Sequence, residues 1–555
     1  MIRDLRRAFP KRLALPILCL LLTATACVPP DRRPVFQPDF DRALATASEP
    51  SMQVRDFIQV EGTPLEKPTG EATEEESEAD LQNLTVEGAV LLALRNNRDL
   101  RVERLNPVIA GTFERIERGV FDPEIFAEAE FFEEEASETS RSTGEQFSVQ
   151  GRETYGAVGV RQFLPTGTTV EGEIRQNRDT SNRSPEQQTA RAGIGVTQSL
   201  LRGFGPAVNL AAVRQAELGA RASVYELRGF AEAVLAETEL AYWNFVLAGR
   251  EISIFQRSLE LAKRQLDEID QRIEVGVLPE IEAAAARAEV ARREQALIDA
   301  QGLLEDRRLR LLRLLGIGRM DREISAVSEI GVEPEPITDL PDRLRLAQQS
   351  RPDLGEARLR LEQDRLETIV TRNGRMPRLE LFLDLGLTGF DDTFSGSFQE
   401  MSGETYDVTA GVRLSQALGN RTATARDEQA RANRRQSAEA VANLEQFVRF
   451  EVRLAANEVE RARRLIAATA TTRALQEETV AAEQARFEVG ASTAILVAQA
   501  QRDLLASQID EVEALVTYRD ALIRLYLAEG SLLGRRGIAI GTEWIGGPGI
   551  GQLTE

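Results

Sequence analysis

The feature that most constrains the fold is a pair of very long helical stretches that end in the same short pattern. The stretches run from about Pro206 to Glu274 and from about Arg421 to Glu488, and no proline interrupts the interior of either. At about 1.5 Å per residue, each would be roughly 100 Å long, far beyond an ordinary globular helix. They end in "RIEVG" (272–276) and "RFEVG" (486–490). Two copies of so long an element indicate an internal duplication.

Each pentapeptide predicts a tight reversal of the chain. Glycine tolerates positive φ and so ends helices at Gly276 and Gly490, and proline suits the first turn of a helix, so helical sequence resumes near Pro279 and Thr493. Each half also opens with a helix-compatible segment, from Leu84, with Thr85 as the expected N-cap, and from Leu340. The opening and returning helices together about equal the long helix in length. We therefore expect two shorter helices stacked end to end beside each long one.

The first long stretch carries an apolar seam. Its apolar residues alternate spacings of three and four, which is the heptad pattern of a surface that packs along another helix. In the second stretch the seam is less regular, because Arg473 and Gln476 fall in register. The seam of the first stretch consists of Ile252, Phe255, Leu259, Ala262, Leu266, Ile269 and Ile273.

Between the opening segment and the long helix of each half lies a region with alternating apolar and polar residues. It begins at Pro123 in the first half and at Pro377 in the second, and period-two patterning after a proline indicates β-strands. The first half contains an additional predicted hairpin at 155–177, around a Pro165-Thr166-Gly167 turn. The first half is therefore expected to hold more strands than the second.

Charge and composition exclude several functional classes. A formal charge of −21 argues against nucleic-acid binding, which needs a basic surface. The chain has no histidine, so catalytic triads and histidine metal sites are impossible, and no phosphate-binding glycine loop occurs. Carboxylates lie mostly at helical spacings beside arginine, which is typical of a solvated face more than of a carboxylate-pair hydrolase. We expect no enzymatic activity, no cofactor and no metal.

The N-terminus resembles a bacterial lipoprotein signal. A basic segment and the short apolar run "LALPILCLLLTATA" precede Cys27. Residues 1–26 are the predicted signal peptide, with Cys27 as the acylated residue, and Val28 in place of an aspartate favours the outer membrane. An ordinary signal peptide with an incidental cysteine is the alternative. Residues 27–80 form a predicted acidic, proline-rich tether.

Taken together, these patterns resemble the TolC-like outer-membrane efflux family. The resemblance rests on the duplicated order of helix, strands, long helix, Val-Gly turn and helix, and on "SLLRGFGPAVN" (199–209) and "AYWNFVLA" (241–248). It covers 81–330 as the first structural repeat and 331–534 as the second, and leaves 535–555 as a predicted flexible C-terminal tail.

The resemblance implies a fold class and an assembly. The fold is mostly α with β: long helical hairpins form a periplasmic tunnel, and strands contribute to a trimeric outer-membrane β-barrel. Four strands from each copy of a homotrimer would make twelve, so we expect the extra hairpin at 155–177 to lie at the outer or rim side of the barrel. The implied partners are a periplasmic adaptor (membrane fusion) protein, an inner-membrane pump of the RND or ABC type, and outer-membrane lipid.

The family's Val-Gly turns form the tunnel tip, where an adaptor is thought to dock. By resemblance, the docking residues here are Val275, Gly276, Val277 and Leu278 in one turn and Val489, Gly490, Ala491 and Ser492 in the other. Arg272 and Arg486 lie one turn earlier, able to bond helix-end carbonyls or nearby acids. Family members often carry entrance aspartates after the second turn, but here "ASTAILVAQAQRD" has no acid before Asp503. Glu280 and Glu282, after the first turn, are the candidate replacements.

The residues alone leave several other functions open. Within the family, a type I protein-secretion duct is not separated from a small-molecule duct, and a metal exporter is disfavoured because Met, Cys and His number only 5, 2 and 0. Outside it, a non-channel coiled-coil structural lipoprotein is possible. The periplasmic adaptor itself is disfavoured by the duplicated strand blocks and the two long hairpins.

Overall fold

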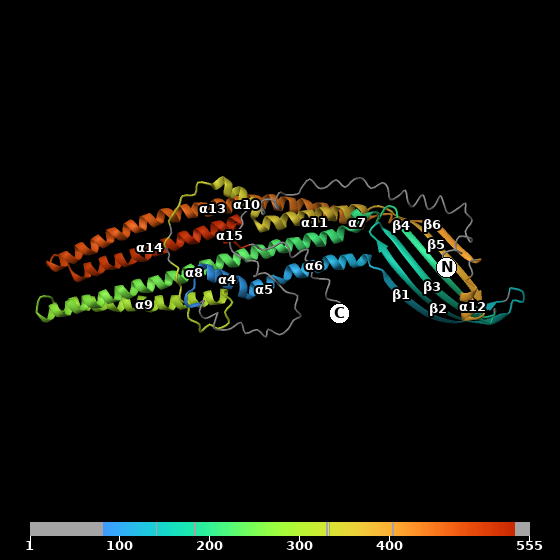
Figure 1. The fold of residues 1–555 in the computed structure, drawn as a ribbon, viewed down its shortest axis with the longest axis horizontal. Helices are drawn as coiled ribbons and strands as arrows, with labels where there is room; N and C mark the ends of the chain where they lie inside the picture. The colour runs from blue at the N-terminus through green and yellow to red at the C-terminus, as the bar shows by residue number, and fades with distance from the viewer. Residues whose placement is uncertain are drawn as a thin grey trace. The chain divides into compact units, whose positions relative to one another are not determined.

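A computed structural model describes residues 81–139, 141–182, 185–328, 331, 333–401 and 404–538 of the chain (Figure 1). Within these residues there are two compact units: a strand unit, formed by 111–218 and 361–437, and a helical unit, formed by 81–110, 219–360 and 438–538. The predictions of a signal peptide, of Cys27 acylation and of an acidic tether fall outside the described residues.

The strand unit is built on one antiparallel sheet. Six strands follow one another across it in sequence order, each hydrogen-bonded to the next. Four come from the first half and two from the second, which confirms the predicted difference between the halves. The strands are β1 (Glu124–Thr139), β2 (Gln146–Leu164), β3 (Thr168–Ser181), β4 (Gln187–Ser199), β5 (Arg378–Asp391) and β6 (Tyr406–Ser415).

The hairpin at 155–177, expected at the outer or rim side of a barrel, is paired within the sheet. This segment makes up most of β2 and β3, which lie between β1 and β4 and are paired along their length with both neighbours. The extra hairpin is therefore an integral part of the sheet and is not an appendage at its rim. The sequence showed that the segment is a strand pair, but alternation alone does not say which strands lie beside it.

The two faces of the sheet differ in polarity. One row of directly opposed residues crosses all six strands on the first face and is almost entirely aliphatic. On the opposite face the neighbouring positions include Arg175 and Arg191, which are also directly opposed. Such alternation is the pattern of a sheet that separates an apolar medium from a polar one. The aliphatic row consists of Ala127, Val158, Ile174, Ala192, Leu387 and Tyr406.

A family-associated motif, 199–209, organises the end of the sheet where β4 leaves it. The Asn209 side-chain amide donates to the carbonyl oxygens of Pro165 (3.0 Å) and Gly203 (2.9 Å). The Gly205 amide donates to Thr166 O at 3.1 Å. These bonds join the β2–β3 turn to the start of the short helix α7 (Pro206–Asn209).

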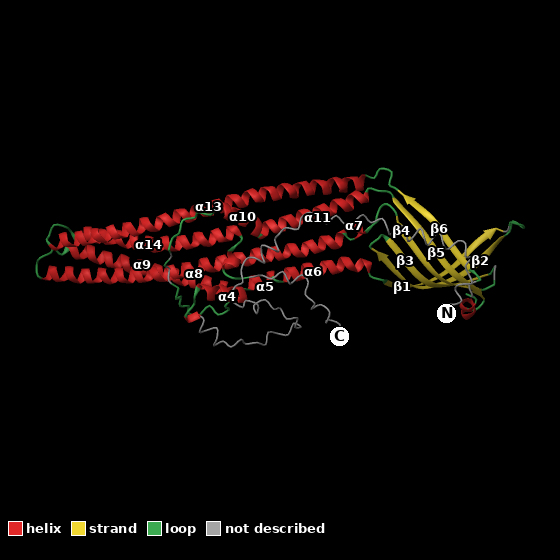
Figure 2. Ribbon diagram, turned by 45° about the horizontal axis from the view of Figure 1, so that its top comes forward, coloured by secondary structure: helices red, strands yellow, loops and turns green. Residues whose placement is uncertain are grey.

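The two long helices end where the pentapeptides predict. α8 (Ala211–Glu274) has 64 residues and α13 (Arg421–Glu488) has 68. Each is followed by a returning helix, α9 (Ile281–Leu314) or α14 (Ala494–Glu529), which lies beside it (Figure 2). The predicted start at Pro206 is corrected, because Leu210 has non-helical dihedrals and separates α7 from α8. Pro279 likewise precedes the N-cap residue Glu280 and is not in the helix.

Burial confirms the predicted seam on α8. Ala262 and Ile269 are buried, and the other five seam residues are half-buried. On α13, Arg473 interrupts the apolar seam and forms an ion pair with Glu511 of α14 at 2.7 Å. The second hairpin therefore replaces one apolar contact of the seam by a polar one.

The opening segments are each broken, where single helices were predicted. The first forms α4 (Val86–Asn96), α5 (Arg98–Glu103) and α6 (Leu105–Arg118), and the second forms α10 (Leu340–Ser350) and α11 (Pro352–Gly374). The main breaks lie at Asn97 and Arg351, whose ψ angles of 122° and 121° are extended. Arg351 precedes a proline, which disfavours the helical region. Thr85 caps α4 as predicted, accepting from the Gly88 amide at 3.1 Å.

These breaks are the points where helices stack end to end, as predicted. The side-chain amide of Asn97 donates to Leu314 O at the end of α9, at 3.0 Å. The equivalent residue of the second repeat, Arg351, donates to Ala528 O near the end of α14, at 3.2 Å. The segments "NRDL" (97–100) and "RPDL" (351–354), which occupy corresponding positions in the two repeats, therefore mark equivalent junctions.

The core of the helical unit explains the second family-associated motif, 241–248. Tyr242 and Trp243 of α8 are buried, and the Tyr242 hydroxyl donates to Leu84 O at 2.9 Å. The guanidinium of Arg519 lies 4.0 Å from the centre of the Trp243 ring. The motif is therefore a packing element. None of the helices in the described part of the chain has the length and apolar character of a membrane-crossing helix.

The fold extends further toward the C-terminus than predicted. Arg535 belongs to helix α15 (Leu532–Arg535). Arg536 donates two hydrogen bonds of 2.6 Å to the buried carboxylate of Glu239. Residues 535–538 are thus part of the helical unit and not of the predicted tail.

A buried acid in α8 predicts a pH-dependent stability. Glu232 is 1% exposed, its Oε1 accepts no hydrogen bond among the described residues, and Arg228 approaches it only to 3.5 Å. Desolvation raises the pKa of Glu232 to about 7, against the opposing charges of Arg228 and Arg351. The folded state thus retains a proton that the unfolded state loses near pH 4.5, so stability falls as pH rises from about 4.5 to about 7.

We expect Glu232→Gln to remove about 2–3 kcal/mol of the stability difference between pH 5 and pH 8. Thermal unfolding followed by helical circular dichroism, at both pH values, measures this as a smaller shift in Tm for the variant. Glu237→Gln, an exposed position on the same helix, is the matched control. Equal pH-dependent shifts in wild type and Glu232→Gln would contradict the assignment.

Candidate functional site

The two Val-Gly turns have the same backbone geometry. At the end of α8, the Gly276 amide donates to Ile273 O at 2.9 Å and the Val277 amide to Arg272 O at 2.9 Å. This pair of bonds is the Schellman motif, which needs positive φ at its glycine. Gly276 has a φ of 74°, and a Cβ added there would meet no atom within 4 Å. The glycine is thus required by the backbone and not by crowding.

The second turn repeats this arrangement at the end of α13. The Gly490 amide donates to Phe487 O at 3.1 Å and the Ala491 amide to Arg486 O at 2.7 Å. Gly490 has a φ of 77° and is equally uncrowded. The sequence prediction that both glycines cap helices is therefore confirmed.

Around these turns, large apolar side chains are exposed. Val275 is 73% exposed, Val277 69% and Val489 79%. An exposed apolar cluster at the end of a hairpin is typical of a contact surface for another protein. We call this cluster the tip surface, and it consists of Val275, Val277, Ile281, Val489, Ile495 and Leu496. Leu278, by contrast, is half-buried.

The flanking arginines take different roles. Arg486 pairs with Glu483 at 2.7 Å, the contact with a neighbouring acid that its position predicts. Glu483 also accepts a hydrogen bond from the Ser492 hydroxyl at 2.7 Å. The contact with Ser492, and to a lesser extent that with Arg486, lowers the pKa of the Glu483 carboxyl. The guanidinium of Arg272 lies 5.4 Å from the centre of the Phe487 ring. A cation–π contact thus joins the first turn to the second.

A further link between the hairpins was missed by sequence reasoning. Glu289 of α9 is buried and accepts from Arg293 at 2.8 Å and from Arg502 of α14 at 2.9 Å. Arg293 is buried as well. In the sequence, Glu289 and Arg293 look like any helical pair spaced by four. Only the approach of α14 distinguishes them from a solvated pair.

The two candidate entrance acids differ in their surroundings. Glu280 is exposed and its side chain makes no capping hydrogen bond. Glu282 is half-buried, and its Oε2 has no hydrogen-bond partner among the described residues. Their role at an entrance stays a prediction.

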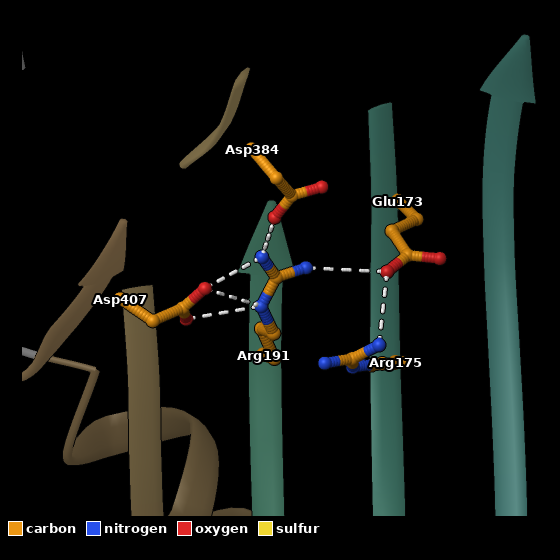
Figure 3. A network of polar contacts seen from close by, with 5 residues as sticks. All are labelled: Glu173, Arg175, Arg191, Asp384 and Asp407. Atoms are coloured by element: carbon orange, nitrogen blue, oxygen red, sulfur yellow. Dashed lines mark hydrogen bonds and ion pairs between the residues drawn. The ribbon is translucent and has the colours of Figure 1, made fainter. Parts of the chain in front are cut away.

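A polar cluster also lies on the polar face of the sheet, and its residues are far in sequence from the two Val-Gly turns (Figure 3). Arg191 of β4 is only 7% exposed and is surrounded by three carboxylates. Its guanidinium donates to Asp407 of β6 at 2.7 and 3.0 Å, to Asp384 of β5, and to Glu173 of β3 at 3.2 Å. Arg175 lies 3.4 Å from the same Glu173 oxygen. The cluster joins strands of both repeats.

Comparison with known proteins gives a clear family match. The model of the family described as "Outer membrane efflux protein" matches residues 150–317 and 344–531. No curated protein sequence matches the chain.

Solved structures share the fold at low identity. The CmeC outer membrane channel of Campylobacter jejuni is 17% identical, with 80% of this chain and 86% of that chain covered, at a TM-score of 0.58. The MtrE outer membrane channel of Neisseria gonorrhoeae, solved in an open state, is 19% identical, with 81% and 89% covered, at 0.58. VceC, an outer membrane protein of Vibrio cholerae, is 16% identical, with 80% and 96% covered, at 0.60. The architecture is therefore that of an outer-membrane channel protomer.

Proposed function

Because the chain belongs to the outer membrane efflux protein family, we propose that it is the passive exit duct of a tripartite export machine. Three copies would assemble in the outer membrane, with their helical hairpins forming a periplasmic tunnel. A periplasmic adaptor would dock on the Val-Gly turns, and an inner-membrane pump would supply the energy. The chain itself would carry out no chemical step and hold no cofactor.

The tip surface is the observation that carries the docking part of this proposal. Its side chains are exposed although they are aliphatic, and both turns present backbone that a partner hairpin can approach closely. Contacts between the two turns, such as Arg272 over Phe487, would hold them in a defined geometry for the partner. Because the residues after each glycine differ, the two turns would offer two distinct docking sites.

The anchoring part rests on the sheet and on the N-terminal sequence. A sheet with one aliphatic face matches the outward face of a membrane barrel, and acylation of Cys27 would add a lipid anchor in the same membrane. The polar face, with Arg191 and its carboxylates, would line the water-filled interior.

Fractionation and mass measurement of the full-length protein test this proposal. We expect SDS-resistant, heat-sensitive trimers in the outer-membrane fraction, and incorporation of a labelled fatty acid that Cys27→Ala abolishes without loss of the trimers. Deleting the gene should raise the intracellular level of the exported compound or protein, and complementation should restore it. A monomeric, soluble Cys27→Ala protein would contradict the proposal. Measuring dye accumulation and secreted proteins in the same strains separates a small-molecule duct from a protein-secretion duct.

A further inference from the structure

The sheet of the strand unit has two open edges. Within the described residues, β1 pairs only with β2, and β6 pairs only with β5. Unpaired backbone groups at such edges are not tolerated inside a bilayer, so a spanning sheet must close. Six strands are fewer than the eight of the smallest membrane barrels, so one copy cannot close on itself. The edges therefore require further copies of this chain.

The two edges are compatible with each other. Because the sheet is antiparallel throughout and has an even number of strands, β6 runs opposite to β1, and joining them continues the alternation. Both edges also present large apolar side chains on the same face, which is the face of the Ala127–Tyr406 row. On β1 these are Ile125 and Phe131, and on β6 they are Val408, Val412 and Leu414.

On the aliphatic face, β2 and β3 carry exposed apolar side chains, as the other strands do. Val158 is 59% exposed and Ile174 54%, and they are directly opposed on the aliphatic face. At a barrel rim these side chains would face water, whereas within the wall they would face lipid. Farther along the same face, the ion pairs Glu133–Arg152 (2.7 Å) and Arg178–Glu186 (2.6 Å) end the apolar band. Even the shortest strand, β6, has 10 residues, within the 9–11 that a tilted spanning strand needs.

We infer that all six strands of each copy belong to the membrane wall, with β6 of one copy paired to β1 of the next, so that three copies form a barrel of eighteen strands. The number of copies rests on the trimer proposed above, whereas the six strands per copy rest on the sheet. Because barrel diameter grows about linearly with strand number, this barrel would be about 1.5 times as wide as one of twelve strands. The membrane segment would then admit bulkier cargo than a twelve-stranded duct.

Cysteine variants carrying a bimane fluorophore test where β2 and β3 lie. In the full-length protein in liposomes containing brominated lipid, Val158→Cys and Ile174→Cys are expected to be quenched as strongly as Val412→Cys, the lipid-facing control on β6. Thr409→Cys, the neighbouring control on the opposite face of β6, is expected to be quenched at least several-fold less. The unmodified parent protein corrects for labelling at the native cysteine.

The outcomes separate this inference from the proposed function. If Val412→Cys is quenched but Val158→Cys and Ile174→Cys are not, and both react on intact cells with a membrane-impermeant maleimide, the hairpin lies outside the wall and the inference is overturned. Cryo-electron microscopy in lipid nanodiscs then counts copies and strands directly. A trimer with a twelve-stranded wall refutes the inference alone, whereas any assembly other than a trimer refutes the proposed trimeric duct.

Discussion

Replacing Val277 and Val489 together by aspartate is expected to abolish export while leaving the assembled protein in the outer membrane unchanged. The two side chains are 69% and 79% exposed, so the substitutions remove little packing within the protomer. At a docked interface, however, each would bury an unpaired carboxylate, at a cost of several kcal/mol. Since about 1.4 kcal/mol is a tenfold change, adaptor affinity should fall by more than about a hundredfold.

Two measurements check this result on the same strains. Accumulation of the exported compound should match that of a deletion strain, and in-cell cross-linking to the adaptor should disappear. Met320→Asp is the matched control, because Met320 is also exposed and apolar but lies in the loop after α9, away from the tip surface. Normal export by the double variant would refute tip docking, and loss of trimers would show that the turns serve assembly.

Replacing Arg191 by methionine is expected to destabilise the sheet more than replacing an exposed arginine on the same face. Arg191→Met would leave Glu173, Asp384 and Asp407 facing one another without their shared cation. Breaking a fully buried ion pair typically costs about 3 kcal/mol or more, but the three carboxylates here are 18–40% exposed, so we expect a smaller cost of about 1–2 kcal/mol. The temperature at which SDS-resistant oligomers dissociate should fall by several degrees.

Removing two of the carboxylates tests whether repulsion among them causes the loss of stability. Adding Asp384→Asn and Asp407→Asn to Arg191→Met should restore much of the lost thermal resistance, because the repulsion disappears along with the cation. Arg413→Met is the control, since Arg413 is 68% exposed on the same face and lies 3.7 Å from Glu380. If Arg191→Met and Arg413→Met have equal effects, the Arg191 cluster has no special structural role.

Local sequence rules predicted most of the secondary structure. The two pentapeptides located the ends of α8 and α13 at Glu274 and Glu488, because a glycine that must adopt positive φ is readily identified. The prolines at 123 and 377 and the alternation after them located β1 and β5. The breaks at Asn97 and Arg351 were harder to predict, because a cap or a proline in a helical pattern also occurs where a helix continues with a kink.

For the proposed docking residues too, the sequence and the structure contributed different information. Their backbone geometry followed from the pattern, while their exposure came only from the structure. The contact of Arg272 with Phe487 joins residues of different hairpins, and no spacing rule connects them. Adaptor docking itself stays a prediction.

By itself, the sequence determined the duplication, the long hairpins, the turns, the hairpin at 155–177 and the strands that begin after Pro123 and Pro377, because these depend on interactions between residues close together in the chain. The tertiary structure decided that the hairpin at 155–177 lies inside the sheet, that Arg191 gathers carboxylates from both repeats, and that Glu289 meets Arg502. These pairings join segments far apart in the chain. Alternation and helical periodicity determine which face of an element is apolar, but they leave open which other element covers it.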